Sequence, residues 1–386
     1  MFLSPAVLIT VLLIINLSII LLWLFLKSHR RIMQINLSTM LLGILLVVLR
    51  LLVPMEFSFQ QTISEKNIFP SLFLLLYTPV FESNATEIYV YHITLLIWGL
   101  GVLFFSIKNL LCYIRFLYII NLEADLCDEK IKKILKKIED TNKKSSDFKI
   151  IRTSKVSIPM YLGLFRPLII LPKIELSDHE LYYILRHEAT HYYNNDMWIK
   201  LLVECISIIY WWNPFVFLLK HEVDKILEIR VDMSVTKTLN ESEKINYLEC
   251  LIRIAKETAS SKLSDFALSF DSRTVSVLSQ RFYIVLAGEE FKKSKIKNVI
   301  LIVSMLFIMF LSSFVVFEPY SINSKDQEKT LELTPENAYL IINADNGYDV
   351  YINNEYFASV TVIRDSYSNL LIYNNLEEAL LNEKEK

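Results

Sequence analysis

The chain lacks both paired cysteines and a large net charge. Its cysteines, Cys112, Cys127, Cys205 and Cys250, are scattered without a C-x-x-C pair. Neither a disulfide framework nor a thiolate zinc knuckle is therefore expected, and we interpret all of them as reduced thiols. The 40 Lys and Arg residues nearly balance 42 Asp and Glu residues, which leaves a net charge of -2. Direct binding of nucleic acid is not expected, because no overall basic field is present.

Hydrophobic residues are abundant instead. They make up 53% of the chain, and the mean hydropathy is +0.37, which is too apolar for an ordinary soluble protein. A bilayer core about 30 Å thick needs about 20 apolar residues in a helix. Four stretches are predicted to span the membrane: residues 5–26, 35–53, 89–107 and 299–317. The shorter apolar stretch 69–81 is expected to pack in or on the outer interface.

The first apolar stretch is interpreted as a retained membrane helix. The residues before it, Met1 to Ser4, contain no basic residue, and no small-residue cleavage site follows. A secretory signal peptide would have both features. The second stretch carries Arg50 near its end, where a long side chain can reach the membrane interface.

Lysine and arginine cluster in segments that four spans would place on one side. The loop Lys27-Ser-His-Arg-Arg31 follows the first span, residues 130–137 follow the third, and residues 292–297 precede the fourth. Basic short loops stay in the cytoplasm, so these segments are expected there. The tail from Glu318 onward holds 13 acidic and 5 basic residues. We therefore predict a multi-pass protein of the cell membrane, bacterial in origin, with its N-terminus and tail outside.

A helix with a metal-binding motif is predicted to begin after Ser177. Ser177 and Glu180 have capping-box spacing ahead of an apolar run. In the following His187-Glu-Ala-Thr-His191, the two histidines at i and i+4 project from one face and can share a tetrahedral zinc ion. Glu188 is predicted to be the general base that activates water at the zinc and later protonates the leaving amine. H-E-x-x-H is only moderately specific, because a charged amphipathic helix can also carry it.

A second predicted helix, residues 221–232, can supply a third ligand. Glu228 and Asp232 lie at i and i+4 on one face of it. We interpret Glu228 as the third zinc ligand, and Asp232 as the carboxylate that accepts the other ring N–H of a ligand histidine. His221 on the same face is a less favoured alternative ligand. For Glu228 itself, the alternative is a solvated helix carboxylate.

The apolar stretch 198–219 separates these two helices. If it crossed the bilayer, the histidines and Glu228 would be about 30 Å apart and no zinc site could form. It is therefore predicted not to cross fully, and to pack within the catalytic domain or against the membrane helices. Pro214 is a suitable place for the chain to turn. The aromatic residues Tyr210-Trp211-Trp212 fit an active site close to the membrane interface.

A β-rich run upstream of the motif is predicted to be an edge strand. Its residues Leu168, Ile169, Ile170 and Leu171 lie between two prolines. An edge strand beside the metal helix can hold an extended substrate by strand addition, so these are candidate substrate-binding residues. A structural strand with no substrate role explains the run equally well.

Several segments together resemble the BlaR/MecR family of membrane metallopeptidases, the sensor-transducers of β-lactam resistance and their relatives. They are Pro159-Met-Tyr-Leu-Gly163, Ile170-Leu-Pro172, Arg186-His-Glu-Ala-Thr-His191 with Asp196 five residues on, Tyr210-Trp-Trp-Asn-Pro214 and Glu228-Ile-Arg-Val-Asp232. The resemblance implies zinc ligands at His187, His191 and Glu228, with Glu188 as the base. Asp196 and Asp232 are the carboxylates expected behind the ligands.

The expected fold is mainly α and multi-pass. Four transmembrane helices are expected together with a cytoplasmic α+β, gluzincin-like zinc peptidase domain and a small extracytoplasmic tail. A β-hairpin is plausible in the tail around Asn346-Gly347 and Asn353-Asn354. The expected domains are residues 1–120 with three transmembrane helices, residues 121–295 for the peptidase, residues 296–318 for the fourth helix and residues 319–386 for the tail.

The family resemblance also suggests partners. Family members of known role bear a large extracellular penicillin-binding domain after the fourth helix and use cytoplasmic proteolysis to relieve a transcriptional repressor. Here about 70 residues follow that helix, without an S-x-x-K or K-T-G pattern, so β-lactam sensing is not expected. The expected partners are the lipid bilayer, a protein substrate such as a cytosolic repressor, and a ligand or partner protein at the tail. A homodimer is left open.

Two other functions are left open. A CAAX-type membrane zinc protease shares H-E-x-x-H but has more spans around its site. A signalling scaffold could keep the zinc fold and work by binding, although it would not need Glu188. Residues 127–144 are interpreted as a charged, solvated helix. Residues 279–297 are either a region of self-cleavage, by family analogy, or a plain linker.

Overall fold

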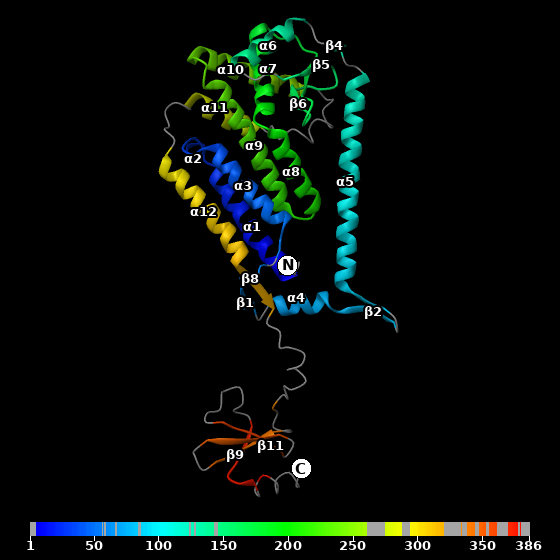
Figure 1. Ribbon diagram of the computed structural model, residues 1–386, viewed down its shortest axis with the longest axis vertical. Coiled ribbons are helices and arrows are strands. Elements are labelled where there is room, and N and C mark those ends of the chain that lie inside the picture. The colour runs from blue at the N-terminus through cyan, green and yellow to red at the C-terminus, as the bar shows by residue number, and fades with distance from the viewer. Residues whose placement is uncertain are drawn as a thin grey trace. The chain divides into compact units, whose positions relative to one another are not determined.

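The structure, a computed structural model, describes residues 5–55, 57, 59–65, 68–83, 86–122, 125–126, 129–142, 146–260, 275–287, 294–319, 333, 338–343, 347–352, 355–360, 370–376 and 379. The chain forms two compact units, Met1–Pro319 and Tyr320–Lys386. Helices dominate the first unit (Figure 1), which confirms the mainly α prediction.

The helices of the first unit are α1 (Pro5–Leu26), α2 (His29–Met33), α3 (Leu37–Leu52), α4 (Ile68–Leu76), α5 (Val90–Leu122), α6 (Glu129–Asn142), α7 (Asp178–Tyr193), α8 (Asp196–Ile209), α9 (Pro214–Thr236), α10 (Glu241–Ser260), α11 (Val275–Ala287) and α12 (Lys295–Phe314). Its strands are β1 (Gln61–Glu65), β2 (Pro79–Ser83), β3 (Thr86–Tyr89), β4 (Asp125–Leu126), β5 (Lys149–Thr153), β6 (Met160–Leu162), β7 (Leu168–Pro172) and β8 (Val315–Pro319).

Three of the described helices, α1, α5 and α12, are long and apolar enough to cross a membrane. Helix α3 is also apolar but has 16 residues, which rise only about 24 Å and fall short of a bilayer core. The third predicted span was too short, because the helix continues past Lys108 and Arg115 to Leu122. The fourth was placed too far along the chain, because the helix begins at Lys295 and ends at Phe314, where strand β8 follows.

The apolar stretch 198–219 reverses direction (Figure 1). Helix α8 ends at Ile209, and Asn213 caps α9 by accepting a hydrogen bond from the Phe215 N–H at 3.0 Å. Pro214 stands in the first turn of α9, where its missing N–H costs nothing. The turn suggested at Pro214 is therefore confirmed, and α8 and α9 form a helical hairpin.

The tip of this hairpin packs against the apolar helices. The Tyr210 hydroxyl donates to the Leu51 carbonyl of α3 at 2.7 Å, and the Asn213 amide donates to the Asn16 side chain of α1 at 3.0 Å. On α5, the Trp98 indole donates to the Ile209 carbonyl at 2.8 Å. Buried residues of α1, α3, α8 and α9 belong to one hydrophobic cluster, so the hairpin and the membrane helices share a core.

A small sheet of order β4-β5-β7-β6 packs beside α6, α7 and α10. Strand β7 pairs with β5 in parallel and with β6 antiparallel. The prediction that residues 168–171 form an edge strand is therefore wrong. The two prolines marked the ends of the strand and left its interior N–H groups free to bond on both sides. Ile169, Ile170 and Leu171 are fully buried, and the edge next to β7 is β6.

The basic segment after α5 packs by one face. In α6, Ile131, Leu135 and Ile138 are buried against the core shared with α7, while Lys132 and Lys136 are exposed. Residues 127–128 and 143–144 of the predicted charged helix lie outside the described residues. Of the cysteines, Cys112, Cys205 and Cys250 are free thiols, and Cys127 lies outside the described residues.

At the far end of α12, β8 pairs in parallel with β1. The Phe317 N–H also donates to the buried Thr10 hydroxyl of α1 at 2.9 Å. The predicted interfacial stretch 69–81 forms α4 and the start of β2.

The second unit contains a sheet of order β11-β10-β9-β12, built from β9 (Ala338–Ile342), β10 (Tyr348–Ile352), β11 (Glu355–Val360) and β12 (Leu371–Tyr373). Strand β10 pairs antiparallel with both β9 and β11. Asn346, Asn353 and Asn354 of the proposed turns lie outside the described residues.

Candidate metal centre

Helix α7 begins with the expected capping box. The Ser177 hydroxyl accepts from the Glu180 N–H at 3.3 Å, and Glu180 accepts from the Ser177 N–H at 2.8 Å. Arg253 of α10 donates to both Glu180 oxygens, at 2.7 and 2.9 Å. Burial alone would raise the pKa of Glu180, but the hydrogen bonds from Ser177 and Arg253 prevail and hold it below its usual value. The capping box of Ser177 and Glu180 marks the start of α7.

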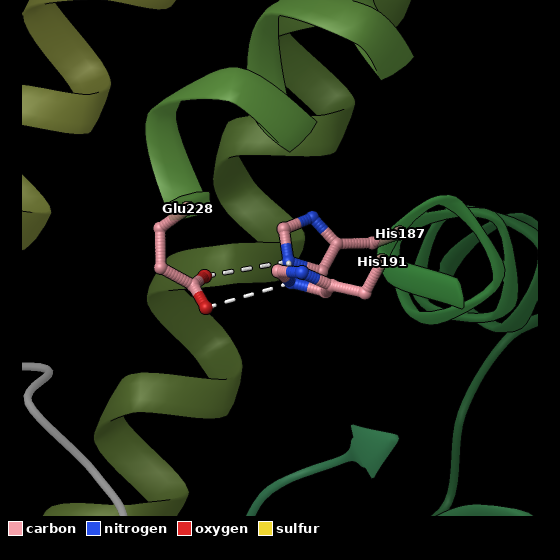
Figure 2. Close-up of side chains that lie close together, drawn as sticks. All are labelled: His187, His191 and Glu228. Carbon is pink, nitrogen blue, oxygen red and sulfur yellow. Dashed lines mark hydrogen bonds and ion pairs between the residues drawn. The ribbon is translucent and has the colours of Figure 1, made fainter. Parts of the chain in front are cut away.

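His187, His191 and Glu228 converge at one point (Figure 2). The two histidines extend from α7 and the glutamate from α9, and one ligand atom from each lies within 4.8 Å of the others. The Nε2 atoms of the two histidines are 3.2 Å apart. His187 Nε2 lies 3.4 Å from Glu228 Oε2, and His191 Nε2 lies 3.5 Å from Glu228 Oε1. All three residues are buried.

The opposite ring nitrogen of each histidine has its own acceptor. His191 Nδ1 lies 2.7 Å from Asp196 Oδ2. His187 Nδ1 lies 2.9 Å from the Tyr247 hydroxyl of α10, which donates onward to Asp232 Oδ1 at 2.6 Å. Such partners place the proton of each imidazole on Nδ1 and leave a lone pair on Nε2.

The donor set fits a bound cation. Two Nε2 lone pairs and a carboxylate face one another in a buried space, and without a positive charge between them these groups would repel each other. Two imidazoles and one carboxylate are also the three protein ligands of many catalytic zinc sites, where a fourth position is left for water. The residues present therefore fit a zinc ion, and His187, His191 and Glu228 are the residues that could hold it.

Asp196 is held in place by the local chain. Asn195 before it has a φ of 59°, in the left-handed region that asparagine tolerates better than most residues. This sharp turn between α7 and α8 brings the buried Asp196 back to His191. Arg230 of α9 forms an ion pair with the other Asp196 oxygen and also donates to the Asn194 carbonyl at 3.4 Å.

Asp232 is joined to the centre through Tyr247 and Arg281. The sequence suggested a direct bond from Asp232 to a histidine, but Asp232 Oδ1 lies 3.4 Å from His187 Nδ1, whereas the Tyr247 hydroxyl lies closer to both groups. Burial and the Asp232 charge raise the pKa of Tyr247 well above 10, so the phenol keeps its proton.

Neither Tyr247 nor Arg281 of α11 was predicted from the sequence. Arg281 donates through Nε and one terminal nitrogen to the two Asp232 oxygens at 2.6 and 2.8 Å, and its other terminal nitrogen lies 3.1 Å from Glu228 Oε2. Burial alone would lower the pKa of Arg281, but the two carboxylates outweigh it and raise the pKa well above its usual value. Tyr247 and Arg281 follow His187 by 60 and 94 residues, so no short-range spacing marks them.

The remaining predicted site residues fall in three places. Glu188 is buried on α7 next to His187. His221 lies on α9, but among the described residues the only metal-capable group consists of His187, His191 and Glu228. Residues 168–171 belong to the doubly paired β7 and cannot accept an added strand.

These features define a membrane-helix protein with a buried His-His-Glu group of the kind that holds a metal ion. Residues 7–285 match the model of the BlaR1 peptidase M56 family. The chain belongs to this family, which confirms the resemblance drawn from the motifs.

Curated relatives agree with the family assignment. The chain is 25% identical over 316 residues to the methicillin resistance mecR1 protein of Staphylococcus aureus, a match that covers 74% of this chain and 53% of the relative. It is 34% identical over 125 residues to the regulatory protein BlaR1 of Bacillus licheniformis, covering 31% of this chain and 21% of the relative. The chain thus spans about half the length of the mecR1 proteins it matches.

Proposed function

We propose that the chain is a zinc-dependent endopeptidase of the membrane with its active site on the cytoplasmic side. The observation that carries the proposal is the convergence of His187, His191 and Glu228 in a buried site on an H-E-x-x-H helix. Membership of the M56 peptidase family supports the same activity. In this assignment the three side chains would hold one zinc ion, and Asp196 and, through Tyr247, Asp232 keep the histidines in orientation.

The chain's own residues provide the acid–base chemistry. A zinc ion in such a site lowers the pKa of water to about 7 and polarises a carbonyl group. Glu188 follows the first histidine on α7, and its side chain is buried. Its carboxylate accepts a proton from the attacking water and returns that proton to the leaving nitrogen of the cleaved peptide bond. Asp196 and Tyr247 keep the Nδ1 proton of each histidine in place, so that each Nε2 stays a ligand.

Strand β6 is the proposed binding place for the substrate backbone. It is the edge of its sheet on the side away from β5, and it packs next to α7. An extended peptide can add to such an edge by main-chain hydrogen bonds. Met160–Leu162 therefore takes over the role that the sequence suggested for residues 168–171.

The proposed topology has four crossings, by α1, α3, α5 and α12; the 16-residue α3 can cross because a bilayer thins locally around a short apolar helix. Basic segments next to two of these helices lie together. The Ser294 N–H donates to the Gln34 carbonyl at 2.9 Å, and the Asn36 N–H donates to the Asn298 side chain at 2.8 Å. These bonds join the start of α12 to Gln34 and Asn36, which follow the basic segment Lys27 to Arg31 within five residues. The positive-inside rule places basic segments of this kind on the cytoplasmic side. It supports a cytoplasmic location for the peptidase part, residues 121–295.

We further propose that the protein transmits a signal by cutting a cytosolic regulatory protein, and that it can cut itself. The printed names of the relatives, a methicillin resistance protein and a regulatory protein, support a regulatory role. The unit from Tyr320 to Lys386 is proposed to contact a ligand or a partner protein outside the cell. The depletion of lysine and arginine in the tail supports a location outside the cell.

The test is a comparison of cleavage products in cells. Wild-type protein, Glu188→Ala and a control, Glu249→Ala, are expressed at equal levels, and new protein N-termini are identified by mass spectrometry. Glu249 is exposed on α10, so its removal leaves the site intact. We expect fragments that appear with wild type and the control and disappear with Glu188→Ala. Identical fragments in all three would indicate a binding scaffold, and cuts confined to prenylated C-termini would indicate a CAAX-type protease.

A further inference from the structure

Helix α11 touches two different parts of the molecule through neighbouring side chains. Leu26 is the last residue of α1, and the amide of the buried Gln280 donates to its carbonyl at 3.1 Å. The next residue, Arg281, reaches Asp232 and Glu228 at the metal centre. One helix therefore connects the end of an apolar membrane helix with the candidate metal site.

The contact with α1 extends over more than one bond. The Tyr283 ring lies 5.2 Å from the His29 ring of α2, between centroids. Helix α2 follows α1 after two residues. Ile284 of α11 is buried in the cluster formed by the apolar helices. Helix α11 is thus docked on the α1–α2 junction by hydrogen bonding, ring contact and apolar burial.

Arg281 also suits the task of orienting carboxylates. A guanidinium is planar and presents its donors in a rigid fork, so it can hold two carboxylates at a defined angle. Here one edge of the fork binds Asp232 and a nitrogen of the other edge meets Glu228. Only 2% of Arg281 is exposed, so water cannot replace it without reorganising the site.

We propose that Arg281 is a positioning residue of the metal site, and that the docking of α11 on the end of α1 through Gln280 sets its place. The proposal rests on the proposed function in one respect, namely that His187, His191 and Glu228 bind zinc. It adds that the metal affinity depends on the position of α11, and therefore on the position of the cytoplasmic end of α1 on which α11 is docked.

The test measures metal binding by the full-length protein in lipid nanodiscs. Cobalt(II) is titrated into metal-free protein and followed by its visible absorption, which reports ligand geometry, and zinc is then titrated in competition. We expect Arg281→Met to bind about 10- to 100-fold more weakly, as found when residues that orient metal ligands are removed, with an altered cobalt spectrum. Arg281→Lys, which keeps the charge but not the fork, is expected to be intermediate.

A matched control comes from α10. Arg253 also donates to both oxygens of a glutamate, Glu180, but outside the metal site. Arg253→Met is expected to bind cobalt as wild type does. Gln280→Leu is expected to weaken binding in the same direction as Arg281→Met and by a smaller factor. The far-ultraviolet circular dichroism of each metal-free variant checks its fold.

The outcomes separate the two proposals. If wild type binds neither metal, the proposed function fails. If wild type binds and both Arg281 variants match it in affinity and spectrum, or bind more tightly, Arg281 does not position the site. If Gln280→Leu binds as tightly as wild type, the link to α1 is refuted.

Discussion

His191 Nδ1 lies 2.7 Å from Asp196 Oδ2, across the sharp turn that separates α7 from α8. The residue at that turn, Asn195, has a left-handed backbone conformation. The start of the α8–α9 hairpin is thus fixed to the metal helix by a carboxylate that also orients a candidate ligand. The same hairpin returns along α9 to supply Glu228.

Asp196→Asn is predicted to weaken zinc binding about 10- to 100-fold, because an amide can present its N–H₂ to Nδ1 and no longer favours a proton there. Competition with a zinc chelator measures the change. Asp178→Asn, an exposed change in the first turn of the same helix, is the control. Equal affinities for the two variants would argue against the proposed role of Asp196.

Tyr247→Phe is predicted to lower the free energy of unfolding of the metal-free protein by about 1–3 kcal/mol, because it leaves buried partners at Asp232 and His187 without their hydrogen bond. Thermal unfolding in detergent measures the loss. Tyr118→Phe on the exposed side of α5 should leave the midpoint unchanged. A Tyr247→Phe variant as stable as wild type would show that the hydroxyl contributes nothing.

Gly101→Leu is predicted to separate α5 from the tip of the hairpin. A Cβ atom at Gly101 would lie 2.3 Å from the Trp211 indole, whereas a Cβ at Gly99 would meet nothing within 4 Å. Overpacking of this kind costs about 1–3 kcal/mol. Gly101→Leu should therefore lower the unfolding midpoint and alter tryptophan fluorescence, and Gly99→Leu should do neither. Equal effects of both changes would contradict the contact.

The stability of the protein is predicted to fall in acid partly through Glu180. Its folded-state pKa is held below the ordinary value of 4.5 by Ser177 and Arg253. A carboxyl group with a lowered folded-state pKa stabilises the fold at any pH above its unfolded-state pKa. This contribution is therefore present above about pH 4.5 and is lost as the pH falls through the folded-state pKa. Glu180→Gln should flatten the dependence of the unfolding midpoint on pH in that range. Parallel curves for the two proteins would refute this.

Much of the site could be predicted because its ligands follow helical spacing. The i and i+4 histidines share one helix face by geometry alone, as do Glu228 and Asp232. The capping box at Ser177 and Glu180 also predicts where the H-E-x-x-H helix begins. The family match adds independent support. Tyr247 and Arg281 could not be found in this way, since each is a single residue brought in from another helix by tertiary packing.

The errors in the fold have physical causes too. The prolines around residues 168–171 suggested an edge strand, yet only the ends of β7 are affected by them and its middle pairs on both sides. The length of α5 was underestimated because Lys108 was taken as its end, although lysine is a good helix former and the helix continues to Leu122.

The most direct test of the central claim is the metal content and ligand set of the purified full-length protein. We predict one zinc ion per chain, with X-ray absorption showing imidazole nitrogens at about 2.0–2.1 Å. Zinc should be lost from His187→Ala and Glu228→Gln but retained by the exposed control Glu249→Gln. Full zinc content in Glu228→Gln, with an unchanged absorption spectrum, would contradict the account.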